Sequence, residues 1–195
     1  MIKLFIVFVF ANILLFFGYG CSPGGILASG GATTMVVAEG DRSLGAVVDD
    51  ATIKFNISTK FLQSDNNLFI NVNSNVIQGR VLLTGLVETQ EIRIDAVRKV
   101  WEVNGVKEVI NEIEIGDKST IKEYANDLWI STQVKALTAK TIGLRALSYN
   151  FETIKGKVYI AGITSRPEQL ESILNEIKNV KGVKEIVNYV IIVKE

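Results

Sequence analysis

The sequence predicts an α+β protein in which one helix–strand–strand–helix–strand unit occurs twice. A shift of 77 positions aligns the chain with itself without a gap, so that Gly79 meets Gly156. The same shift aligns the identical strings Gly105-Val-Lys-Glu108 and Gly182-Val-Lys-Glu185. Because the same offset aligns both the glycine positions and an identical four-residue string, the chain is predicted to be a tandem repeat of one structural unit.

Five segments follow from this repeat and from the composition of the 195 residues. Two small domains are compatible with this length. The predicted segments are a lipoprotein signal peptide over 1–20, a flexible Gly/Ser-rich tether over 21–48, a first unit over 49–117, a linker over 118–125 and a second unit over 126–195.

Each unit is expected to open with a helix that has an aspartate as its N-cap, Asp50 or Asp127. Apolar residues at helical spacing then predict the buried face of each helix. These residues are Ile53, Ile57 and Phe61 in the first unit and Ile130, Val134 and Leu137 in the second.

The rest of each unit is predicted as a hairpin, a helix and a last strand. Turn signals at Gln78-Gly79 and Lys155-Gly156 separate the two hairpin strands, and a C-cap glycine ends each second helix. A hairpin followed by a right-handed crossover gives a mixed three-stranded sheet, which two helices would cover on one face. The strands are expected over 68–73, 80–87 and 107–115, and over 145–150, 157–163 and 184–193.

The N-terminus has the pattern of an export signal. Lys3 precedes an apolar run over 4–17, and Cys21 follows a small residue. This arrangement resembles a bacterial lipobox, which implies lipidation of Cys21, although Gly18 stands where leucine is usual. An uncleaved membrane anchor is the alternative.

Composition disfavours several function classes. The chain has 21 basic and 21 acidic residues, no histidine and one cysteine. We therefore expect no nucleic-acid binding, no cofactor, no metal site and no catalysis.

The glycine strings resemble the BON domain. They are Gly79-Arg-Val-Leu-Leu-Thr-Gly85 with Gly105-Val-Lys-Glu-Val-Ile-Asn111, and Gly156-Lys-Val-Tyr-Ile-Ala-Gly162 with Gly182-Val-Lys-Glu-Ile-Val-Asn188. Two such units behind a lipidated cysteine are similar to dual-BON-domain outer-membrane lipoproteins. The resemblance implies a lipid-anchored protein on the periplasmic face of the outer membrane, concentrated at the cell division site, that supports envelope integrity. It also implies binding of anionic phospholipid, such as phosphatidylglycerol, through the first helix of the second unit.

The residues of that helix are compatible with lipid binding. Trp129 lies off the core stripe and shares a face with Gln133, Ala136 and Lys140. Lys135 and Lys140 are candidates for phosphate contacts, and Ile142 and Leu144 for insertion. Burial of Trp129 between the two units is the alternative, and Trp101 is expected to be buried.

Charge separates the two units further. Residues 49–117 contain 7 basic and 11 acidic residues, a net charge of −4, and residues 127–195 contain 10 and 7, a net charge of +3. A basic surface attracts anionic lipid, but ordinary solvated faces would give the same count.

Two other hypotheses remain open. One is a periplasmic module that binds the outer-membrane assembly machinery or cell-wall and division factors, and the other is an unlipidated periplasmic stress protein.

Overall fold

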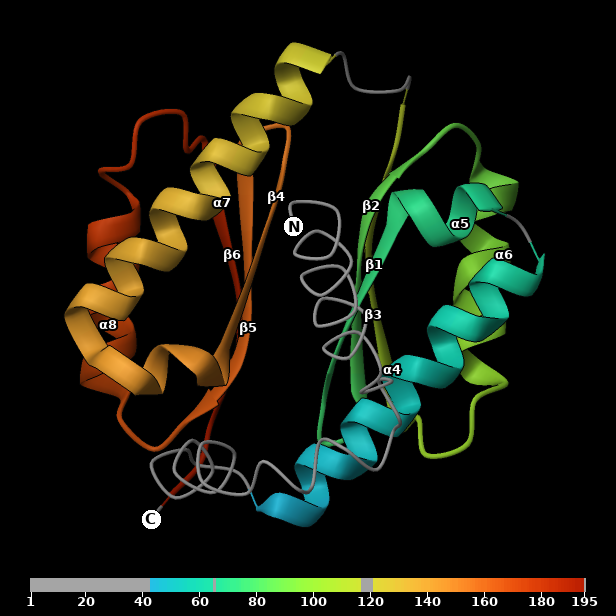
Figure 1. Cartoon of the computed structure of the whole chain (residues 1–195), viewed down its shortest axis with the longest axis horizontal. Coiled ribbons are helices and arrows are strands. Elements are labelled where there is room, and N and C mark those ends of the chain that lie inside the picture. Colours follow the sequence, from blue (N-terminus) through green and yellow to red (C-terminus); the bar gives the residue numbers. More distant parts are fainter. Residues whose placement is uncertain (1–42, 65, 117–120, 195) are drawn as a thin grey trace, which may run out of the picture. The chain divides into compact units, whose positions relative to one another are not determined.

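The computed structural model describes residues 43–64, 66–116 and 121–194. The predicted signal peptide, Cys21 and most of the tether lie outside these residues. Within them the predicted element order occurs twice (Figure 1). The first repeat contains α4 (Leu44–Ser64), α5 (Asn66–Asn71), β1 (Val72–Ile77), β2 (Arg80–Val87), α6 (Gln90–Trp101) and β3 (Glu108–Ile115). The second contains α7 (Ile121–Ile142), the 3-10 helix η1 (Gly143–Ser148), β4 (Tyr149–Ile154), β5 (Lys157–Thr164), α8 (Pro167–Ile177) and β6 (Glu185–Ile192).

Each repeat has the predicted mixed sheet. In the first, β2 pairs antiparallel with β1 and parallel with β3, and in the second β5 does the same with β4 and β6. Figure 1 shows that the helices of each repeat lie along one face of its own sheet. The predicted α+β class and sheet arrangement are therefore confirmed.

The first strand of each repeat was predicted too early. Helix α5 and the 3-10 helix η1 occupy most of the segments predicted as strands, and β1 and β4 begin at Val72 and Tyr149. The hairpin turn explains the difference. Gln78 and Gly79 both have positive φ, 55° and 80°, as a two-residue type I′ turn requires. This turn pairs Ile77 with Arg80 and so fixes the register back to Val72.

The two aspartates predicted as N-caps have a different role. Helices α4 and α7 begin several residues before them, and both carboxylates are buried. Asp50 accepts backbone N–H bonds from Gln78 (2.8 Å) and Gly79 (2.9 Å). Asp127 accepts the same pair of bonds from Lys155 (2.7 Å) and Gly156 (2.8 Å). Each aspartate thus holds its hairpin turn against its first helix.

Each repeat has its own core between its helices and its sheet. The predicted stripe of Ile53, Ile57 and Phe61 is buried in the first core. In the second, Ile130 and Val134 are buried, but Thr138 continues the stripe in place of Leu137, which is half-buried. The hydroxyl of Thr138 donates to the carbonyl oxygen of Val134 at 2.9 Å, which satisfies its polar group inside the core.

The faces of the sheets that the helices leave uncovered contact each other. A third apolar cluster is formed there by Ile77 and Leu82 of the first repeat with Ala161 and Ile163 of the second. Polar pairs border this cluster. Tyr159 donates to Glu114 at 3.3 Å, Tyr189 donates to Glu112, and Asn73 donates to Glu152 at 3.0 Å.

Candidate functional site

The outer side of α7 carries most of the residues predicted to bind lipid. Trp129 is 45% exposed, so it is not the buried inter-unit residue of the alternative interpretation. It precedes Ile130 of the core stripe by one position, which turns its side chain about 100° away from that of Ile130. Gln133, Ala136 and Lys140, which share the face of Trp129, are also exposed, as is Lys135.

The end of α7 differs in part from the prediction. Ile142 is half-buried and packs against the second core, so it is poorly placed to insert into a membrane. Leu144 is exposed as predicted, and Leu147 is exposed as well. Leu147 was missed because residues 145–150 were predicted as a strand, whereas η1 directs this side chain outward from a short helix.

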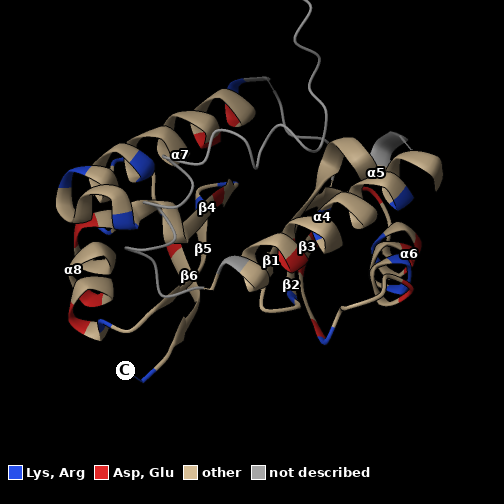
Figure 2. Ribbon diagram, turned by 60° about the horizontal axis from the view of Figure 1, so that its bottom comes forward, with Lys and Arg blue, Asp and Glu red and all other residues tan. Residues whose placement is uncertain are grey.

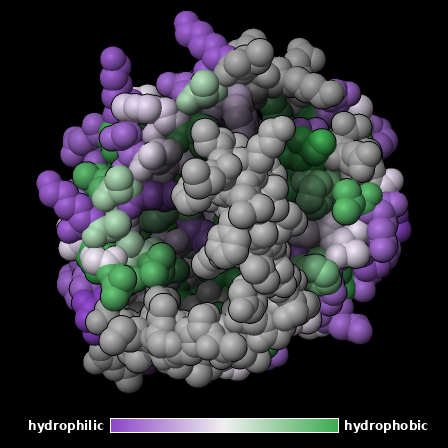
Figure 3. Space-filling model, in the orientation of Figure 1, coloured by the Kyte–Doolittle hydropathy of each residue, from purple (hydrophilic) through white to green (hydrophobic). Residues whose placement is uncertain are grey.

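Two further exposed residues lie in the first turns of α7. Tyr124 and Leu128 are both more than half exposed. Tyr124 was missed because the helix was predicted to begin at Asp127, whereas α7 begins at Ile121. Figure 3 shows hydrophobic surface over the η1 region of the second repeat and over the α5 region of the first.

Basic residues accompany this surface. Lys135 and Lys140 lie on α7 and Arg145 on η1, and Figure 2 shows this basic end of α7 in blue. Acidic residues at the other end of the helix, Glu123 and Asp127, leave its C-terminal half as the positive part. An exposed indole beside lysines is the residue pattern of an interfacial helix.

The first repeat has an apolar surface that sequence reasoning did not identify. Val48, Phe55 and Leu62 are exposed on the side of α4 opposite its core stripe, and Phe69 of α5 continues the seven-residue spacing. Thr52 and Thr59 lie between them, and their hydroxyls donate to the carbonyl oxygens of Val48 and Phe55 at 2.9 and 3.0 Å. The hydroxyls are therefore satisfied within the helix, and the strip is uncharged. Trp101, predicted to be buried, is 53% exposed at the end of α6.

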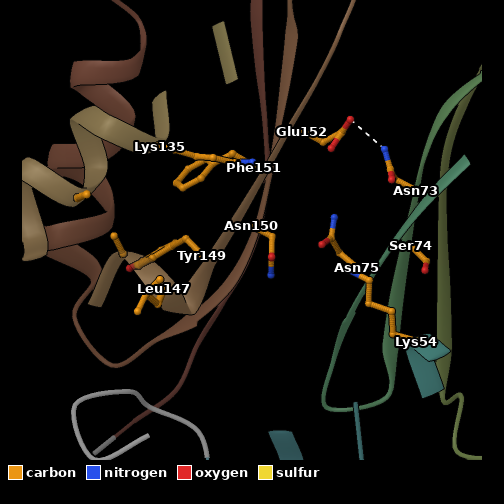
Figure 4. Close-up of a pocket in the computed structure, with 12 residues that line it drawn as sticks. Lys54, Asn73, Ser74, Asn75, Lys135, Leu147, Tyr149, Asn150, Phe151 and Glu152 are labelled. Atoms are coloured by element: carbon orange, nitrogen blue, oxygen red, sulfur yellow. Dashed lines mark hydrogen bonds between the residues drawn. The ribbon is translucent and has the colours of Figure 1, made fainter. Parts of the chain in front are cut away.

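A polar pocket of about 520 Å³ lies between the two repeats (Figure 4). Asn73 and Asn75 of β1 point toward Asn150 and Glu152 of β4. Lys54 of α4 and Lys135 of α7 complete its charged lining. Burial raises the pKa of Glu152, although both lysines and the hydrogen bond from Asn73 act to lower it.

Neither a metal site nor a membrane-spanning helix is found among the described residues. No group of three or more Cys, Asp or Glu residues there is arranged to hold a metal ion. Between Ser43 and Lys194, no described helix has the length and apolar character needed to span a bilayer.

Comparisons with known proteins agree with the repeat. The BON domain model matches residues 49–117 and 126–194. An uncharacterized protein in the gshII 5' region of Anaplasma centrale is 39% identical over 144 residues, 73% of this chain and 94% of that protein. The outer membrane lipoprotein DolP of Haemophilus influenzae is 29% identical over 164 residues, 82% of this chain and 84% of DolP. The 21 kDa hemolysin of Actinobacillus pleuropneumoniae is 30% identical over 154 residues, 76% of this chain and 78% of that protein.

Proposed function

Because the chain belongs to the BON-domain family and carries two BON domains in tandem, we propose that it is an outer-membrane lipoprotein that binds anionic phospholipid. The binding surface is the exposed side of α7 together with η1, in the second domain. The protein supports envelope integrity as a binding protein, without catalysis. The similarity to DolP, which is named an outer membrane lipoprotein, supports the location.

The observation that carries this proposal is the exposed indole of Trp129 on a helix whose C-terminal half is basic. Indole side chains favour the interface between lipid headgroups and acyl chains. Leu144 and Leu147, 54% and 62% exposed, add apolar area near the end of the same helix. Each lysine close to an anionic surface adds about 1 kcal/mol of attraction. Lys135 and Lys140 fit this role.

A lipid anchor at Cys21 would make this weak surface effective. Two acyl chains attach a protein stably, whereas one chain binds marginally. The anchor would hold the domains near the membrane, so even low-affinity contacts through α7 would be occupied for most of the time. We expect lipidation of Cys21, with the odd Gly18 slowing the cleavage step rather than preventing export.

The test uses a fragment from Val36 to Glu195, which forms one compact unit and lacks Cys21. Co-sedimentation with phosphatidylglycerol vesicles should exceed that with phosphatidylcholine vesicles. Trp129→Glu should abolish it, because a carboxylate replaces the inserting ring beside anionic headgroups. Phe55→Glu is the matched control, since it places the same charge on an exposed aromatic position of the equivalent helix in the first domain. Loss of binding with Phe55→Glu but not with Trp129→Glu would place lipid binding in the first domain and contradict the proposal.

The apolar strip on α4 favours a second candidate function. The first domain is acidic, yet Val48, Phe55 and Leu62 form an uncharged exposed strip on it. Such a strip suits an apolar face of another envelope protein, from the outer-membrane assembly machinery or from cell-wall and division factors. A photo-crosslinking residue at position 55 in cells should then capture a defined protein, and the adduct should persist in a Trp129→Glu background. Crosslinks to lipid alone would exclude this function.

A further inference from the structure

We propose that Asn188 protects the outer edge of β6 from pairing with a strand of another chain, in particular with β6 of a second copy. The side chain does so by accepting a hydrogen bond from a backbone N–H that an added strand would need. This inference does not rest on the proposed lipid function. It assigns a role to the asparagine that ends the string Gly182-Val-Lys-Glu-Ile-Val-Asn188.

Strand β6 is an open edge of the second sheet. Among the described residues it pairs with β5 alone, because the sheet has the order β4-β5-β6. Seven of the eight residues of β5 are buried, whereas none of the eight residues of β6 is buried. Ile192, at the end of β6, is 56% exposed. An edge strand of this kind presents unpaired N–H and C=O groups to which another strand can bind.

The composition of β6 favours pairing at this edge. Residues 186–193 contain no glycine, proline or charged side chain, and Asn188 is the one residue among them that is neither aliphatic nor aromatic. An uncharged run of β-branched and aromatic residues is the pattern of a segment that assembles with copies of itself. The equivalent strand β3 has three glutamates, Glu108, Glu112 and Glu114, so charge already disfavours pairing there. Strand β6 therefore needs another form of protection.

The geometry of β6 places the bond from Asn188 on its open side. The N–H of Val193 donates to the carbonyl oxygen of Thr164, at the end of β5, at 2.9 Å, so it points into the sheet. Backbone N–H groups alternate in direction along a strand, so the N–H of Val190, three residues earlier, points outward. Asn188 Oδ1 accepts this outward N–H at 3.0 Å. A strand added at the edge would therefore find the Val190 donor already occupied.

The first repeat has the same bond. Asn111 Oδ1 accepts the N–H of Ile113 at 3.1 Å. The N–H of Gly116 donates to β2 at 2.9 Å, so the N–H of Ile113 also points away from its sheet. Strand pairing continues without a break through both asparagines, so neither bond is needed to bend or end its strand. Asparagine is disfavoured in strands, and a protective role at the edge accounts for its presence there.

The test measures association of the Val36–Glu195 fragment and its variants by sedimentation velocity over a range of protein concentrations. Asn188→Ala should raise the dimer association constant about thirtyfold, because a two-fold antiparallel pair of β6 strands gains one backbone hydrogen bond from each copy. Asn188→Val should behave likewise, and its strand-favouring side chain guards against a loss of folding. Adding Ile192→Lys to Asn188→Ala should restore the monomer, since an edge lysine opposes pairing.

Matched controls separate the hydrogen bond from general effects. Asn188→Asp keeps an acceptor oxygen, so it should remain monomeric even at about 1 M salt, where charge repulsion is screened. Asn56→Ala removes an exposed asparagine from α4 in the first domain and should leave association unchanged. Association of Asn188→Ala no stronger than that of Asn56→Ala would overturn the proposal. Equal association of Asn188→Asp and Asn188→Ala at high salt would also overturn it, because the bond would then not be what keeps the edge unpaired.

Discussion

Glu112 and Tyr189 occupy the same position in the two repeats, and they are hydrogen-bonded to each other. They are 77 residues apart, which equals the offset of the repeat, and the tyrosine hydroxyl donates to the carboxylate. Contact between equivalent positions means that an approximate two-fold axis relates the paired sheet faces. The chain therefore packs its two domains much as a homodimer packs two copies.

Tyr189 makes this contact sensitive to alkaline pH. Burial and the bond to Glu112 raise the pKa of Tyr189 to about 12, above its ordinary value of 10. The neutral hydroxyl thus stabilises the folded state below the unfolded pKa, and this contribution is lost as the pH rises through about 12. We expect the urea midpoint to fall between pH 10 and about 12, and to fall less in Tyr189→Phe. At pH 7, Tyr189→Phe should cost about 1 kcal/mol. An unchanged alkaline profile in the variant would show that Glu112 and Tyr189 do not interact in solution.

Asp127 predicts a larger loss of stability. Asp127→Asn replaces one carboxylate oxygen by an NH₂ group that faces a backbone N–H of the hairpin turn. The loss of one charged hydrogen bond should lower the free energy of unfolding by about 2 kcal/mol, measured by urea denaturation. Asp50→Asn should behave similarly in the first domain. Asp49→Asn is the control, because Asp49 is exposed one residue earlier and should change stability little.

These aspartates show what the sequence can and cannot predict. The repeat, the strand order and the core faces follow from periodicity and glycine positions, because those signals are local. The function of Asp50 does not, because its partners are 28 and 29 residues away, at Gln78 and Gly79. An N-cap aspartate and a buried aspartate that binds a distant turn look alike in sequence, since both are short carboxylates near the start of a helix.

The candidate site was predictable to a similar degree. Trp129 and Lys140 were found because their exposure follows from the helical spacing relative to Ile130. Leu147 and the pocket between the two domains were missed. Leu147 depends on the end of a helix, which sequence patterns locate poorly. The pocket depends on how the two sheet faces meet, which no local pattern records.

Gly85 lies where β2 packs closely against the start of β1, so adding a side chain there should destabilise the first domain. A Cβ at Gly85 would lie 2.1 Å from the carbonyl oxygen of Asn71, and φ there is +149°. Gly85→Ala should therefore destabilise by at least about 2 kcal/mol. Gly143→Ala meets no atom within 4 Å and has φ of +62°, so only the left-handed backbone penalty of about 1 kcal/mol remains. Thermal unfolding should rank the two variants in this order. Equal losses would mean that backbone strain alone determines the cost.

Lys140 predicts how the proposed membrane contact responds to salt. Lys140→Glu reverses one charge at the basic end of α7, beside the exposed face of Trp129. Loss of the attraction alone costs about 1 kcal/mol, and the new repulsion adds to it, so affinity for phosphatidylglycerol vesicles should fall about tenfold. Lys194→Glu makes the same charge change on an exposed lysine beside the start of α8, and should have a smaller effect. The difference between these two variants should shrink at 1 M salt, where screening limits charge interactions to about 3 Å. Identical behaviour of the two variants at low salt would indicate that net charge attracts the domain, without a defined surface on α7.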